Sequence, residues 1–493
     1  MSKMKELGKK SAGVFILQII GQVISMLFAV LVGRFIGAEK YGQVLYVLSV
    51  FSIIEVFTKF GFSESLIAFL ARNDINDRQQ KWILRLSIKL SLLFSFSSIV
   101  VILMFPKIPL LLLGKKSVSI GLLYLMLLYI PNQTIIALFA SVLRAKGAFF
   151  QYILVSDVVA KIIQITAVII FLFLGWSGEY AIVTAYYLGQ ILSLIYGGFL
   201  VLRLGLLSGE SEKYDAWIFL KFSFSQLFTA GIAVLNTEID KYVLGYVIDS
   251  SSVAIYSAAV KVASMSTLML SSVNAVFAPM ISNLYFSGNM KELESLYKRS
   301  TMWLVVANLY VSGMICAFQD DIMRFFGEEF IAGSVILVIV LLGQLINAGV
   351  GSVGYMNSMT GHPQYRMWAD TIGLFSNVML NLILVRDFGI LGVGVATAAS
   401  LAIKNIVNFI FVYRNLHIHP YSKRFIGVGG IFVLGYFLLL MLRNMMNVHY
   451  IIRIIVCGVI YSIVYGMLTY SFVCSDNEKV LIKRNVARLK KFS

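Results

Sequence analysis

Residues 12–33 read AGVFILQIIGQVISMLFAVLVG and contain no charged side chain. An apolar helix of about 20 residues is long enough to cross the hydrocarbon of a bilayer. The basic stretch before it, Lys3 to Lys10, is typical of a signal peptide. However, the apolar run is longer than a signal peptide needs, and no A-x-A cleavage site follows it. The sequence therefore predicts that this segment is a first membrane crossing.

Similar apolar runs recur along the chain, and they set the fold class. Of 493 residues, 59% are hydrophobic and 13% are charged, against roughly 45–50% and 25% in soluble proteins. The runs are too long for the strands of a membrane β-barrel. We therefore predict an all-α integral membrane protein with about 14 transmembrane helices, of which the seventh and eighth are tilted, kinked or extended beyond the hydrocarbon. The expected crossings are residues 12–33, 43–62, 86–106, 119–142, 150–174, 180–202, 217–246, 253–283, 300–318, 332–356, 366–385, 389–413, 425–442 and 451–473.

Basic residues indicate the orientation of the chain. There are 41 Lys and Arg against 24 Asp and Glu, a net charge of +17. With the N-terminus inside, the predicted inner segments hold 26 basic residues and the outer segments 9, so the positive-inside rule places both termini in the cytoplasm. In a membrane protein this charge is a topology signal, and we expect no nucleic-acid partner. We predict a multi-pass membrane protein.

Two inner segments are typical of helices that lie on a membrane surface. In the tail from Asp476 to Ser493, Ile482, Val486 and Leu489 form one stripe among basic residues, which suits an anionic leaflet. A solvated tail is the alternative. Met290 to Tyr297 resembles a shorter version of such a helix. The longest predicted loop has about 25 residues, which leaves no room for a soluble catalytic domain, so we expect no enzyme.

The two halves of the chain share residues at a constant offset. The matches at an offset of 213 are Gln151, Tyr152 and Asp157 with Gln364, Tyr365 and Asp370, and Thr184 with Thr397. This offset spans six crossings, so the copies would have the same orientation, as in transporters with parallel repeats. We predict two pseudo-symmetric six-helix lobes, residues 1–205 and 206–415, and two extra C-terminal helices with a basic tail in 416–493. A cavity between the lobes is the expected substrate site.

Apart from Lys221, which is counted with the inner segments, six Lys lie within the predicted crossings. Each would cost about 2.5–3.5 kcal/mol at mid-depth if it faced lipid alone. Lys89 lies near a cytoplasmic end and can snorkel, and three others have an acid three or four residues away. These pairs are Lys59 with Glu55, Lys161 with Asp157, and Lys241 with Glu238. Asp240, next to Lys241, is left to find its partner elsewhere.

Lys261 and Lys404 have no acid three or four residues away in the sequence. In a hydrated cavity they would attract an anionic ligand such as a diphosphate. Alternatively, they pair across helices, for instance with Asp370 or Asp240. Arg34, at the outer end of the first crossing, either guards the cavity mouth or anchors the interface. No Arg lies deep in a predicted crossing, which favours Lys point charges over a bidentate phosphate clamp.

Oxygen-bearing side chains in the later crossings suggest an ion site. Asn377 and Asn381 share one helix face, and with Asp240 and Thr397 they could ligate a small hard cation. The Asn-x-x-x-Asn pattern is also common as a link between helices. We expect no cofactor. An H-x-H sequence before Pro420 without a third ligand is weak evidence for a metal.

Several strings of residues resemble the polysaccharide-transport branch of the MOP exporter superfamily, the Wzx-type O-antigen flippases. They are VGRFIG (32–37), IDK (239–241), AIYSAAVK (254–261), PMIS (279–282) and NVMLNL (377–382). The resemblance covers essentially the whole chain. One departure is Ala254, which stands where a Gly is usual.

This resemblance implies a function. Members move undecaprenyl-diphosphate-linked oligosaccharides from the inner to the outer leaflet, by alternating access, for O-antigen, capsule or exopolysaccharide assembly. The implied partners are the lipid-linked substrate, membrane lipids, and a polysaccharide polymerase or other assembly proteins. The candidate cavity residues are Lys261, Lys404, Arg34, Lys241, Lys59 and Lys161, with the acids Glu55, Asp157, Glu238 and Asp370.

The resemblance also implies a candidate site for the coupling ion. In related lipid II flippases a sodium site uses crossings seven, eleven and twelve, which here correspond to Asp240, Asn377, Asn381 and Thr397. Asn381 stands where that site has an acid, so the choice between Na+ and H+ stays open.

Four alternative functions make different demands on the sequence. A lipid II flippase would have a cavity richer in Arg, and a multidrug antiporter of the same superfamily would have an acidic one. A membrane glycosyltransferase or polymerase would need a large outer loop or a carboxylate cluster at a membrane face. A passive scaffold would leave the buried charges without a purpose.

Overall fold

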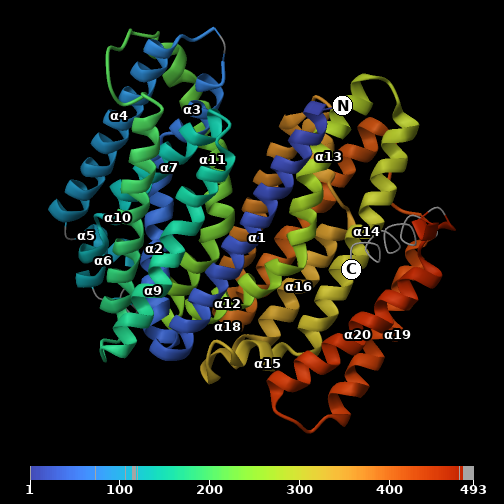
Figure 1. Ribbon diagram of the computed structural model, residues 1–493. Helices are drawn as coiled ribbons and strands as arrows, with labels where there is room; N and C mark the ends of the chain where they lie inside the picture. Colours follow the sequence, from blue (N-terminus) through green and yellow to red (C-terminus); the bar gives the residue numbers. More distant parts are fainter. Residues whose placement is uncertain are drawn as a thin grey trace. The chain divides into compact units, whose positions relative to one another are not determined.

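The structure is a computed structural model that describes residues 2–480 except 73, 106, 114–117, 119, 423 and 477 (Figure 1). The side chains of residues 2–15, 18, 110 and 275 are not described. The surface helix predicted between Asp476 and Ser493 therefore falls largely outside the described residues. In the part of the chain that is described, every regular element is helical.

Thirteen helices of the described part are long and apolar enough to cross a bilayer. One of them, α18, contains two of the predicted crossings, so the expected membrane architecture is confirmed. The first elements are α1 (Ser2–Ile36), α2 (Ala38–Lys59), α3 (Phe62–Leu70), α4 (Asp77–Met104), α5 (Lys107–Leu113), α6 (Ile120–Met126), α7 (Tyr129–Ala145), α8 (Phe149–Ile153), α9 (Val159–Phe173) and α10 (Glu179–Arg203). They are followed by α11 (Ala216–Val247), α12 (Ser250–Ser264), α13 (Leu268–Phe286), α14 (Met290–Ala317), α15 (Gln319–Arg324), α16 (Ser334–Gly349), α17 (Val353–Met359), α18 (Pro363–Leu416), α19 (Arg424–Met445) and α20 (Tyr450–Phe472).

Backbone breaks modify the predicted crossings. Gly37 (φ 96) separates α1 from α2, so the second crossing starts at Ala38, and Phe60 in the left-handed region (φ 45) ends it. The predicted run 253–283 is broken by a 3₁₀ turn at Met265–Thr267. Gly389 (φ 58, ψ −136) interrupts α18 in a conformation that is easily accessible only to glycine. The 3₁₀ turn divides a run that was predicted to be continuous, whereas Gly37 and Gly389 lie between or at the ends of predicted crossings.

The chain divides into two compact units. The first contains residues up to Ala258 together with 324–333 and 370–397, and the second contains 259–323, 334–369 and the remainder after Ala398. The predicted lobes, with boundaries at 205/206 and 415/416, rest on the internal repeat and stay a prediction.

In the first unit, α2 packs closely against α11 and against the start of α12 because glycines line these contacts. A Cβ atom on Gly42 would lie 1.7 Å from the carbonyl oxygen of Ser250, and one on Gly245 would lie 2.4 Å from the ring of Tyr46. Small residues let helix backbones approach in this way. The side chain of Asp215 caps the start of α11 by accepting backbone N–H groups of its first turn. The contact fixes the position of α11 against α2.

In the second unit, α14, α19 and α20 share a hydrophobic core that includes the buried Tyr461 and Cys457. Helices α19 and α20 lie side by side (Figure 1). Nη2 of Arg453, on α20, donates to both carboxylate oxygens of Asp321, on α15, at 2.7 and 2.8 Å. Because Asp321 is only 3% exposed, this ion pair connects α20 firmly to α15.

Candidate functional site

A buried polar cluster surrounds the carboxylate of Asp240, on α11 in the first unit. Its Oδ1 accepts a hydrogen bond from Nδ2 of Asn381 at 2.7 Å. Its Oδ2 accepts from the hydroxyls of Tyr256 at 2.5 Å and Thr397 at 2.8 Å. The carboxylate is 5% exposed, and a buried carboxylate needs such donors to offset its desolvation. The partner that Asp240 was expected to find elsewhere is therefore this set of three donors.

The two asparagines extend the cluster along α18. Nδ2 of Asn381 also donates to Oδ1 of Asn377 at 3.0 Å. Oδ1 of Asn381 is buried and has no hydrogen-bond partner among the described residues. A buried acceptor without a donor is uncommon in folded proteins. The cluster therefore has one oxygen available for a ligand.

The break at Gly389 helps to assemble this cluster. Asn377 and Asn381 precede it in α18 and Thr397 follows it, while Tyr256 comes from α12. The sequence predicted the association of the asparagines, Asp240 and Thr397, but it assigned no role to Tyr256. Tyr256 lies 16 residues from Asp240, so no helical spacing points to it. Its presence in the AIYSAAVK string was the only signal.

A second polar site in the first unit is a cavity of about 280 Å³ between α2, α3, α7 and α11. Its ionisable residues are Glu55, Glu64, Glu238 and Lys59. Nζ of Lys59 lies 2.6 Å from Oε2 of Glu55, as predicted. The predicted pair of Glu238 with Lys241 is also formed, at 2.8 Å. Because acids outnumber bases in the lining, this cavity is not the cationic site that was expected.

The predicted pair of Asp157 and Lys161 is not formed. Residues Leu154–Val158 make a π-helical turn, in which the spacing of hydrogen-bonded residues is longer than in an α-helix. Asp157 instead accepts from the hydroxyl of Ser156. Lys161 donates to Oε1 of Gln164 at 3.1 Å and lies over the rings of Phe28 and Tyr186.

The remaining candidates occupy different places. Lys261 and Lys404 belong to the second unit, are half-buried, and each interact with another group, so neither is an isolated charge. Arg34 is exposed at the end of α1. Asp370 lies beside α11, where its backbone carbonyl accepts a hydrogen bond from Asn236 at 3.4 Å. The described residues contain no group of three or more His, Cys, Asp or Glu arranged to hold a metal ion.

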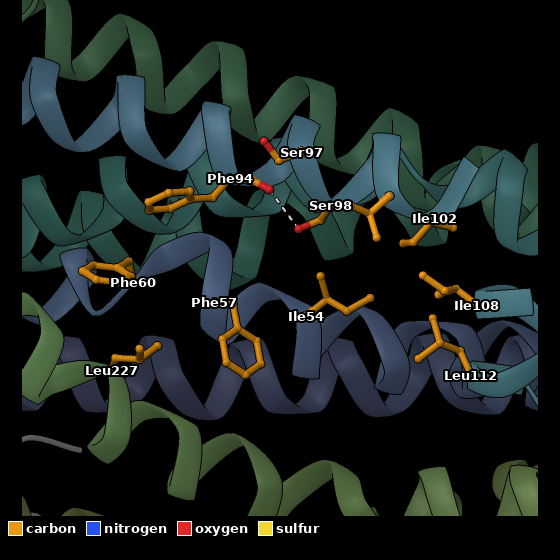
Figure 2. Close-up of a pocket in the computed structure, with 11 residues that line it drawn as sticks. Ile54, Phe57, Phe60, Phe94, Ser97, Ser98, Ile102, Ile108, Leu112 and Leu227 are labelled. Atoms are coloured by element: carbon orange, nitrogen blue, oxygen red, sulfur yellow. Dashed lines mark hydrogen bonds between the residues drawn. The ribbon is translucent and has the colours of Figure 1, made fainter. Parts of the chain in front are cut away.

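An apolar groove of about 530 Å³ lies on another face of α2 (Figure 2). Figure 2 shows Ile54 and Phe57 of α2 and Ile102 of α4 among the lining side chains, with Ile108 and Leu112 of α5 at one end. The hydroxyl of Ser98, the one dashed bond in the view, donates to the carbonyl of Phe94 at 2.8 Å and is thus satisfied internally. The lining suits an alkyl chain. Helix α2 thus carries an apolar groove on one face and a polar cavity on another.

Comparison with known families identifies the chain. Residues 7–285 match the family model described as "Polysaccharide biosynthesis protein". The chain belongs to the polysaccharide biosynthesis protein family. A second family model, MatE, matches residues 227–383. Both agree with the predicted resemblance to polysaccharide flippases of the MOP superfamily, and they indicate a transporter rather than an enzyme.

Individual proteins extend this comparison. The chain is 26% identical to the probable low-salt glycan biosynthesis flippase Agl15 of Haloferax volcanii over 47% of the chain and 48% of that protein. It is 23% identical to the uncharacterized membrane protein MJ1068 of Methanocaldococcus jannaschii over 90% of both.

Two solved structures show the same fold. The lipid II flippase MurJ in an inward closed conformation has a TM-score of 0.70 at 17% identity, covering 93% of this chain and 98% of MurJ. An inward-facing MATE family multidrug resistance transporter of the MOP superfamily has a TM-score of 0.68 at 15% identity, covering 80% of this chain and 94% of the transporter.

Proposed function

We propose that this member of the family is a flippase for lipid-linked oligosaccharides. The observation that carries the proposal is the match of residues 7–285 to the polysaccharide biosynthesis family, supported by the similarity to Agl15. The substrate is an oligosaccharide joined through a diphosphate to a polyprenyl lipid such as undecaprenol. It moves from the inner to the outer leaflet of the bacterial cytoplasmic membrane, for O-antigen, capsule or exopolysaccharide. Both termini are cytoplasmic, and a polysaccharide polymerase is the expected protein partner.

The physical demands of this substrate agree with the surroundings of α2. A glycan is too polar to cross hydrocarbon unshielded, whereas a polyprenyl chain is stable there. The apolar groove of Figure 2 suits the tail, and the polar cavity lined by Ser52, Gln133 and Thr237 offers hydrogen bonds to sugar hydroxyls. Alternating exposure of the polar site to the two sides then completes transport.

The diphosphate requires cations, and Lys261 and Lys404 are the proposed contacts. Both are half-buried within membrane-spanning helices. A cation there is energetically costly, and such residues commonly mark a substrate or ion pathway. Lys261→Ala and Lys404→Ala should each lower transport while leaving expression unchanged. Wild-type transport by both variants would contradict this assignment.

The Asp240 cluster is the proposed site of a coupling ion, Na+ or H+. A flip of the Asn381 side-chain amide, which exchanges the positions of its oxygen and nitrogen, would direct its unpartnered oxygen towards Asp240. The facing oxygens of Asp240, Asn381, Asn377 and Thr397 would then suit a small hard cation, which prefers oxygen ligands. For H+, the same carboxylate would be the acceptor. Asp240→Asn should change the ion dependence of transport, and an unchanged dependence would remove Asp240 from this role.

A multidrug-type antiporter is the second candidate, because acids predominate in the cavity that contains Glu55, Glu64 and Glu238. Such a lining favours a cationic substrate. The deciding experiment depletes the protein in cells and measures lipid-linked oligosaccharide separately in each leaflet. The flippase predicts accumulation in the inner leaflet. The antiporter predicts no accumulation and greater retention of cationic dyes, and a lipid II flippase predicts accumulation of the peptidoglycan precursor.

A further inference from the structure

A basic hollow in the second unit is not used by the proposed transport path. It has a volume of about 420 Å³ and lies between the first turns of α14 and the start of α19. Its cations are Lys291, Lys298, Arg299 and Arg424, its one acid is Glu294, and Ser295, Met302 and Ser422 complete the lining. It thus combines a concave shape with a marked excess of positive charge.

Two of the four cations are held in place by acids. Nζ of Lys298 lies 2.6 Å from Oε1 of Glu294. Arg424 lies 3.8 Å from Oε2 of Glu478. Lys291 and Arg299 have no carboxylate within ion-pair distance among the described residues. When Glu294 and Glu478 are counted against the four cations, two positive charges at this hollow are left without a compensating acid among the described residues.

The depth of the hollow in the membrane follows from helix length. Helix α14 has 28 residues, about 42 Å at 1.5 Å per residue, whereas the hydrocarbon is about 30 Å thick. Its charged first turns, Met290 to Tyr297, are the part that extends into the headgroup region, and they continue directly into the crossing instead of forming the separate surface segment that was predicted. Arg424 is the first residue of α19. Both helix starts follow inner loops in the predicted topology, so the hollow faces the inner headgroup layer.

We propose that this hollow binds the phosphate of an anionic phospholipid of the inner leaflet. A phosphate oxygen accepts hydrogen bonds from Lys and Arg side chains, and Lys291 and Arg299 supply the uncompensated donors. Exposed Arg424 and Lys291 let a headgroup enter from the membrane plane. Basic hollows between helices on the cytoplasmic side are suited to anionic headgroups. A bound lipid would bridge α14 and α19 through charge.

The test compares two variants of the full-length protein that remove the same charge. Lys291→Gln with Arg299→Gln removes the uncompensated cations of the hollow. Lys213→Gln with Lys221→Gln is the control, because both residues are exposed near the predicted inner face in the first unit. Purified proteins are titrated with phosphatidylglycerol or phosphatidylcholine, and bound lipid is counted by native mass spectrometry. Melting temperatures verify that each variant is folded.

The proposal expects the hollow variant to bind phosphatidylglycerol about 30-fold more weakly, at about fivefold per cation, while the control and the phosphatidylcholine titration stay unchanged. A parallel titration with inorganic phosphate distinguishes a lipid headgroup from free phosphate as the ligand. If inorganic phosphate binds with the same dependence on Lys291 and Arg299 and phosphatidylglycerol is not preferred, a free phosphate is the ligand and the lipid is excluded. Equal losses in both variants, or none in either, would overturn the proposal.

Discussion

Replacing Tyr256 with Phe tests whether the Asp240 cluster binds a cation. The change removes one hydroxyl that donates to Oδ2 of Asp240 at 2.5 Å and leaves the ring in place. A hydrogen bond to a charged group contributes about 1.5–3 kcal/mol. Because Thr397 still donates to the same oxygen at 2.8 Å, we expect a loss near the lower value, about 1.5 kcal/mol, in the ion-free protein.

The same loss should strengthen ion binding. A cation at Asp240 competes with the Tyr256 hydroxyl for the charge on Oδ2, so removal of that donor makes the carboxylate a better ligand. About 1.4 kcal/mol corresponds to a tenfold change in an equilibrium constant. The variant should therefore bind Na+ about tenfold more tightly than the wild type. A cation that binds only the folded protein raises its melting temperature as its concentration passes Kd.

The assay is thermal unfolding of purified protein, with NaCl replaced by choline chloride at constant ionic strength. Tyr297→Phe is the matched control, because the buried Tyr297 hydroxyl donates to the carbonyl of Val350 at 2.7 Å, in the second unit. The control should lower the melting temperature without altering the Na+ concentration at half-effect. Equal or weaker Na+ binding by Tyr256→Phe would refute the competition argument. If Na+ stabilises neither the wild type nor Tyr256→Phe, sodium is not the ligand.

Three further predictions concern stability. Gly42→Ala should destabilise the protein by about 3 kcal/mol or more, because the added Cβ would overlap the Ser250 carbonyl. The control Gly430→Ala, at a position with open space around it, should be neutral or stabilising. Equal melting temperatures of the two variants would contradict the packing described. Arg453→Gln leaves the buried Asp321 carboxylate without its partner and should cost about 3 kcal/mol, measured by denaturant unfolding against the exposed control Arg78→Gln. Burial acts to raise the pKa of Glu478, but hydrogen bonds from Ser475 and the Trp303 ring outweigh it and hold that pKa below its usual range. The stabilisation is therefore present above the unfolded-state pKa, about 4.3, and is lost as the pH falls through the lower folded-state pKa. If the melting temperature of Glu478→Gln falls on acidification in the same way as that of the wild type, the prediction is wrong.

The fold could be predicted from sequence because the bilayer imposes a minimum length on each apolar helix. The breaks could not, since Phe60 and Met265–Thr267 are ordinary helix-compatible residues whose conformation depends on tertiary packing. Glycines are better signals, and Gly389 lies where two predicted crossings meet. Even there, the sequence did not indicate a nearly continuous helix.

The polar contacts also divide into those that the sequence predicts and those that it does not. Pairs on regular helix, such as Glu55 with Lys59, follow from a spacing of four residues. Asp157 and Lys161 form no direct ion pair because Asp157 itself lies in a π-helical turn. The interaction of Tyr256 with Asp240 joins two helices, and no local pattern encodes it. The association of Asp240 with the asparagines was predicted from their oxygen-bearing side chains and from the resemblance to a family, not from a helical spacing.

The contact of α2 with α11 has a consequence for movement. At Gly245 the ring of Tyr46 lies against bare backbone, and at Gly42 the backbone of α2 lies against that of Ser250, where α12 begins. At these positions there is no layer of adjustable side chains that could repack if α2 slid past α11. The two helices must therefore travel as one rigid piece during any transport cycle. The bending has to occur at positions such as Gly389 and the 3₁₀ turn after α12, where the helical hydrogen bonding is already interrupted.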